Sequence, residues 1–162
     1  MAVVSTEVQG RRKLRFRSFD DVLADAHRIH EGNYEALGNW SLGQALKHLG
    51  SSMHFSVNGV GFPVSWKIFI LGRLVFRPVI LYWRFPPGAK LPPRAERAIV
   101  PSHDTSFEEG LRALQGGIDH LAADTTNRVP HPVIGNLSVR QWNRFHLRHA
   151  ELHLSFFVEP KP

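Results

Sequence analysis

Apolar residues recur along this chain at helical spacing, and four such stretches each follow a helix-start motif. In a capping box, a serine side chain accepts a hydrogen bond from the backbone amide three residues later. An acidic or amide side chain at that later position bonds back to the serine amide. The four motifs predict helices over about 18–32, 41–57, 106–124 and 138–157, which begin at Ser18, Ser41, Ser106 and Ser138. Strand signals are weak throughout.

The connection between the second and third predicted helices is the longest in the chain. Roughly 47 residues rich in proline and glycine separate them, from Gly59 to Thr105. Such a segment can return the chain along the molecule, so that the second and third helices run parallel. The pattern therefore predicts an all-α fold, a four-helix bundle with a long crossover between helices 2 and 3.

Part of this crossover, from Phe62 to Trp83, is strongly apolar. Lys67, Arg73 and the internal Pro78 interrupt it, so it lacks the ~18 uninterrupted apolar residues of a membrane-spanning helix. We expect no transmembrane segment. In order of preference, the stretch is interpreted as a segment docked on the domain, a contact of a homodimer, or an interfacial helix.

Composition and charge add limits to this picture. The chain has 162 residues, a formal charge of +6 and a sequence pI of about 10.3. We expect one domain over 18–157, preceded by a basic N-terminal arm over 1–17, which we interpret first as solvated and second as a nucleic-acid contact. No nucleic-acid motif accompanies the arm. Cysteine is absent, which excludes disulfides and thiolate ligands, and together with the lack of a signal-peptide pattern suggests a cytoplasmic protein.

Histidines carry the candidate chemistry. His149 and His153 are four residues apart on the last predicted helix, about 40° apart around its axis, and can both reach one ion. His146 with His149 is a competing pair. On the second helix, His48 lies beside the apolar face and is the best candidate for a third ligand, although a buried, hydrogen-bonded histidine is the alternative reading.

A family resemblance accompanies these histidines. The chain resembles the DinB-like (YfiT-like) superfamily, within a branch of uncharacterised proteins, through the run Gly38 to Gln44 leading to His48-Leu49, the run His131 to Ser138, Trp142, and His149-x-x-x-His153-Leu154. The resemblance covers about residues 18–157. It implies a four-helix bundle that holds a divalent metal ion through His48, His149 and His153.

The sequence departs from many members of that superfamily in one place. A His-His doublet often occurs at the last ligand, whereas this chain has Leu152-His153. The final ligand is kept, and a neighbour that tunes it is missing. We interpret His131 and Trp142 as structural: the first shapes the loop into the last helix, and the second packs about two turns before the site.

Three neutral imidazoles leave an ion with at least one open position, as in catalytic sites. Water or the thiolate of an external low-molecular-weight thiol can occupy this position. The resemblance implies such a thiol, because some members of the superfamily use low-molecular-weight thiols. A metal-dependent thiol transferase or hydrolase acting on a small molecule of unknown identity is therefore one hypothesis. Zinc, nickel, iron and manganese are not distinguished by an all-histidine set. No general base stands out, and the second hypothesis is a non-catalytic bundle that binds a partner or an apolar ligand through residues 64–83.

Overall fold

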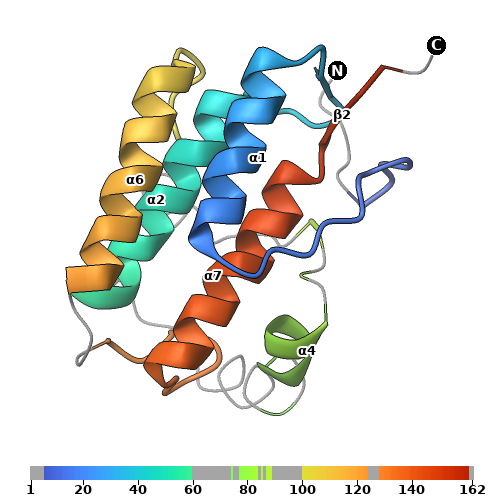
Figure 1. Ribbon diagram of the computed structural model, residues 1–162. Coiled ribbons are helices and arrows are strands. Elements are labelled where there is room, and N and C mark those ends of the chain that lie inside the picture. Colours follow the sequence, from blue (N-terminus) through green and yellow to red (C-terminus); the bar gives the residue numbers. More distant parts are fainter. Residues whose placement is uncertain are drawn as a thin grey trace.

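A computed structural model describes residues 6–59, 74, 77–83, 85, 87–88, 100–123 and 128–160. The protein is mostly helical, which confirms the all-α class (Figure 1). Three of its four long helices fall within the predicted ranges, and α2 extends one residue beyond its predicted end at 57. The elements in this part of the chain are α1 (Phe19–Glu31), β1 (Glu35–Ala36), α2 (Leu42–Asn58), α4 (Arg77–Tyr82), α6 (Phe107–Ala123), α7 (Val139–Leu154) and β2 (Phe157–Val158).

Helix starts follow the predicted capping motifs. Complete capping boxes form at Ser18, Ser41 and Ser138. At the fourth motif, Ser106 accepts from the amide of Glu109 as predicted (3.2 Å), but the Glu109 carboxylate pairs with Lys47 of α2. The prediction of a full box at Ser106 was therefore wrong in its second half, because a cation on the neighbouring helix takes the carboxylate.

Glycines bring α2 and α6 into close, parallel contact. A Cβ added to Gly43 would lie 2.4 Å from the carbonyl oxygen of Thr105, and one added to Gly50 would lie 2.1 Å from that of Ala113. On α6, Gly110 meets Gly43 and Gly117 meets Gly50 in the same order, so the two helices run in the same direction, as the long connection predicted (Figure 1). The crossover that joins them lies largely outside the described residues.

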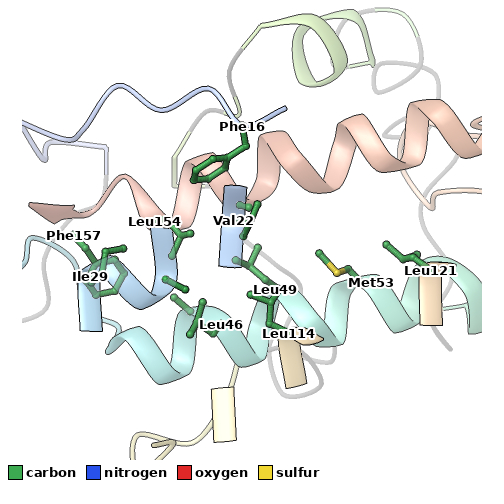
Figure 2. Packing of buried hydrophobic residues seen from close by; sticks show 13 residues of the cluster. Phe16, Val22, Ile29, Leu46, Leu49, Met53, Leu114, Leu121, Leu154 and Phe157 are labelled. Atoms are coloured by element: carbon green, nitrogen blue, oxygen red, sulfur yellow. The ribbon is translucent and has the colours of Figure 1, made fainter. Parts of the chain in front are cut away.

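One hydrophobic core joins all four long helices. Val22 of α1, Leu46 of α2, Leu114 of α6 and Leu154 of α7 have no exposed surface, and their side chains gather in Figure 2. Burying each such side chain contributes about 1.5–3 kcal/mol to stability. This core holds α2 and α7 in the positions from which the candidate site is built.

The helix α4 packs against the start of α7 in a second apolar cluster. Ile80 and Leu81 are buried there with Trp142, Phe145 and Ile134. Part of the apolar stretch is therefore docked on the domain, which was the preferred of its three interpretations. Most of the remaining residues of the stretch lie outside the described residues. Among the helices that the structure describes, none is both long and apolar enough to cross a membrane.

The C-terminal end of the fold differs from the prediction. The last helix was expected to reach residue 157, but α7 ends at Leu154, and Phe157 and Val158 pair antiparallel with Ala36 and Glu35. Two strands of two residues each carry too little alternation to be recognised in a sequence.

The segment before α1 is docked against the helices, which corrects the expectation of a solvated arm. Arg12 forms two hydrogen bonds to the buried carboxylate of Asp25, at 2.9 and 2.7 Å. Phe16 is 7% exposed, and its amide donates to the carboxylate of Glu151 of α7 (2.6 Å). A buried acid on α1 and another on α7 hold this part of the basic segment. The division into 1–17 and 18–157 stays a prediction.

Candidate metal centre

The three predicted histidines lie together where α2 and α7 cross. The two helices are antiparallel, so that His48 of α2 faces the C-terminal part of α7. The Nε2 atom of His149 lies 3.2 Å from Nε2 of His48 and 3.0 Å from Nε2 of His153. The nearest ring nitrogens of all three lie within 4.8 Å of one another. The predicted convergence of these three rings is confirmed.

These separations suit a shared ion. Two nitrogens that each lie ~2.0–2.1 Å from one metal are about 2.9 Å apart at a right angle and about 3.4 Å apart at a tetrahedral angle. The two measured separations fall between these values. We looked among the described residues for groups of three or more His, Cys, Asp or Glu side chains that lie close enough together to hold an ion. His48, His149 and His153 form such a group.

Aromatic rings surround the cluster. Trp40 stacks on His153 with an interplanar angle of 4° and meets His48 edge-on, with centroid distances of 5.1 and 4.9 Å. The ring centroid of Phe85 lies 5.3 Å from that of His149, and Phe145 contacts both Phe85 and His149. These flat side chains limit the rotation of the imidazoles and exclude water from their faces.

Burial keeps the imidazoles of His149 and His153 neutral. It lowers the pKa of His149 and of His153 well below the usual histidine value, and the neighbouring rings of the cluster add to the effect. A neutral imidazole has one nitrogen lone pair available for a metal ion. His149 and His153 are therefore in the form that binds a cation without first losing a proton.

His146 is excluded from the cluster, and the competing pair His146–His149 is wrong. Its ring is 1% exposed and stacks on Trp142, while its Nε2 lies 3.1 Å from Oγ of Ser56. Burial lowers the pKa of His146 to about 3. The ring is one helical turn from His149, and its Nε2 contacts Ser56 in the C-terminal half of α2.

The loop before α7 contains the other histidine singled out by the sequence. Nδ1 of His131 accepts hydrogen bonds from the amides of Val133 and Ile134, at 3.1 and 3.2 Å. Burial lowers the pKa of His131 to about 4, so the ring stays neutral and can keep accepting. Its predicted role in shaping this loop is confirmed.

Two further histidine pairs lie away from the site. His27 and His30 are exposed, and both contact Phe107. His120 packs against His54 with a centroid distance of 4.7 Å. His54 lies on α2 and His120 on α6, and the register of these two parallel helices depends on the glycine contact between them.

Sequence reasoning missed three side chains that contact the cluster. Ser52 lies four residues after His48 on the same face of α2, and that spacing is a signal that can be read. Trp40 belongs to the motif before α2, but nothing in its position indicated a ring stacked on His153. Phe85 comes from the crossover, where no periodicity places a side chain.

Comparison with known proteins gives one match. No curated protein and no solved structure matches the sequence. The family model described as "Protein of unknown function (DUF1569)" matches residues 8–160, nearly the whole chain and all three histidines of the cluster. The chain therefore belongs to the DUF1569 family.

Proposed function

We propose that this protein is a metal-dependent enzyme that holds a divalent ion through His48, His149 and His153. The observation that carries the proposal is the convergence of three Nε2 atoms, with separations of 3.2 and 3.0 Å to the central ring. Three uncharged nitrogen ligands and no carboxylate ligand leave the ion's full charge for an exogenous group.

The bound ion would supply Lewis acidity, lowering the pKa of a water or thiol in its open position. The chain's own residues fix the geometry. The rings of His48, His149 and His153 all contact one another, with centroid distances of 4.7 to 5.0 Å, and Trp40 holds two of the rings in place. Phe85 covers His149 and keeps bulk water from one face. This arrangement suits a thiol transferase or a hydrolase, in which the reacting nucleophile comes from outside the protein.

We also propose that the four long helices form a four-helix bundle of the DinB-like (YfiT-like) type. The parallel direction of α2 and α6 and the single core shared by α1, α2, α6 and α7 support this proposal. So does the order of the three histidines, one on α2 and two at i and i+4 on α7.

Metal analysis tests the function. Protein purified without a histidine tag should contain about one equivalent of a divalent ion, and the loaded protein should then be screened for hydrolysis and for thiol-dependent transfer. Substoichiometric metal after incubation with zinc, nickel, iron or manganese salts would reject the proposal.

A non-catalytic role is favoured by a different observation. Leu74, Tyr82 and Trp83 are 71%, 54% and 72% exposed, so part of the apolar stretch 64–83 presents large side chains to solvent. A homodimer or a partner that covers them is the second candidate. Light scattering that shows a monomer over a wide concentration range would remove the homodimer.

A further inference from the structure

A serine contacts the central histidine of the candidate metal centre from the side opposite the other two rings. Oγ of Ser52, on α2, lies 3.4 Å from Nδ1 of His149, while Nε2 of the same ring faces His48 and His153. The serine thus contacts the nitrogen that faces away from the other two histidines.

A second contact of the hydroxyl decides which atom carries the proton between them. Oγ of Ser52 also lies 2.8 Å from the backbone carbonyl oxygen of Leu49, one turn earlier in α2. A carbonyl oxygen only accepts, so the single hydroxyl proton of Ser52 goes to Leu49. The lone pairs of Oγ then face Nδ1 of His149, and the favourable arrangement has the proton on that nitrogen.

The position of this proton determines what the other nitrogen can do. A neutral imidazole with its proton on Nδ1 has its lone pair on Nε2. In metal sites, the hydrogen bond made by the second ring nitrogen fixes the tautomer and orientation of a histidine ligand and raises its basicity. In His149, that lone pair lies between the two flanking imidazoles.

We infer that Ser52 is a positioning residue, which holds His149 as the Nδ1-protonated tautomer so that its Nε2 lone pair faces the ion. The inference rests on the proposed metal centre. It adds a residue outside the ligand set, whose role is to orient the central ligand and not to contact the metal.

The chain provides a matched control on the same helix face. Ser56, one turn after Ser52, donates to the carbonyl oxygen of Met53 (2.7 Å) and lies 3.1 Å from Nε2 of His146. It makes the same two kinds of contact, but its histidine lies outside the cluster. Ser56→Ala therefore removes an equivalent hydroxyl without touching a ligand.

The experiment compares zinc affinity by calorimetry in metal-stripped wild type, Ser52→Ala, Ser52→Thr and Ser56→Ala. Ser52→Ala should bind zinc about 10–100-fold more weakly than wild type. Ser52→Thr keeps the hydroxyl and should restore most of the affinity, while Ser56→Ala should match wild type. Urea unfolding of the metal-free variants separates an effect on ligation from an effect on folding.

Nitrogen NMR of the histidine rings gives a readout that stability alone does not change. In metal-free and zinc-bound wild type, His149 should carry its proton on Nδ1, and Ser52→Ala should populate the other tautomer in the metal-free state. Wild-type zinc affinity in Ser52→Ala, an equal loss in Ser56→Ala, or an unprotonated Nδ1 in wild type would each overturn the inference. Failure of the wild type to bind zinc would instead overturn the proposed function itself.

Discussion

Two histidine–serine pairs cross the contact between α2 and α7, about one helical turn apart, and they differ in what surrounds the second ring nitrogen. His149 meets Ser52 through Nδ1 and two further imidazoles through Nε2. His146 meets Ser56 through Nε2, and its buried Nδ1 has no hydrogen-bond partner in the described part of the chain.

The difference shows what separates a candidate ligand from a structural histidine in this fold. Both rings are neutral, because burial lowers the pKa of each. Both have a serine that donates to its own helix. Only His149 presents its free lone pair to other ligand atoms, and that follows from ring orientation and from the position of His48 on the facing helix.

Removing the central ligand is the strongest way to test this comparison. His149→Ala deletes the ring that meets both other histidines, so zinc affinity should fall by well over ~100-fold, more than for loss of an outer contact. His153→Ala should act similarly. Metal content and calorimetry measure the effect. Zinc retained by both variants would mean that the cluster is not the binding site and would favour the non-catalytic role.

A change at the glycine contact should disturb both pairs together. A Cβ at Gly50 would lie 2.1 Å from the backbone oxygen of Ala113, so Gly50→Ala must push α2 away from α6. We expect a loss of about 3 kcal/mol in the free energy of unfolding, measured in urea, at the upper end for overpacking.

Gly116→Ala is the control for that change. Among the described residues, the neighbour within 4 Å of its added Cβ is Nε2 of His54, at 4.0 Å, so the variant should gain about 0.5–1 kcal/mol from helix propensity. Equal stability of the two variants would contradict a close contact between the helices.

Replacing His146 should lower the stability of the fold without affecting zinc binding, in contrast to replacing the proposed ligand His149. His146→Ala leaves a cavity beside Trp142 and removes the partner of Ser56, so it should lower the free energy of unfolding by about 2–3 kcal/mol. Zinc stoichiometry should be unchanged. If His146→Ala loses zinc as completely as His149→Ala does, the choice of ligand pair on α7 is wrong.

Acid should weaken the fold through the same buried ring. The pKa of His146 is about 3 in the folded protein and lies near 6.5 in an unfolded chain, so its contribution is complete above pH ~6.5 and is lost as the pH falls towards 3. Between pH 7 and 5 the metal-free protein should lose about 2 kcal/mol on this account.

Urea unfolding at several pH values measures this loss. In His146→Gln the slope of stability against pH should decrease, and the dependence that remains should include that of His131, whose pKa is about 4. An unchanged slope in His146→Gln would show that the ring is protonated in the folded state.

Much of the fold was predictable because its determinants are local. A serine followed three residues later by Asp, Gln or Glu places a helix start through hydrogen bonds within one turn, and three of the four motifs formed as predicted. The exception, Glu109, shows the limit of local reasoning, since a lysine on another helix took its carboxylate. The short β1–β2 pairing was missed because it depends on two distant segments.

The sequence by itself determined the four helices and the i, i+4 spacing that places His149 and His153 on one face of α7, since both follow from helical periodicity. Only the tertiary structure decided that His48 meets them, that His146 turns to Ser56, and that Trp40 and Phe85 cover the cluster. These contacts depend on how far apart α2 and α7 lie and in which register. Packing across the whole core sets that distance and register, and no single stretch of sequence encodes them.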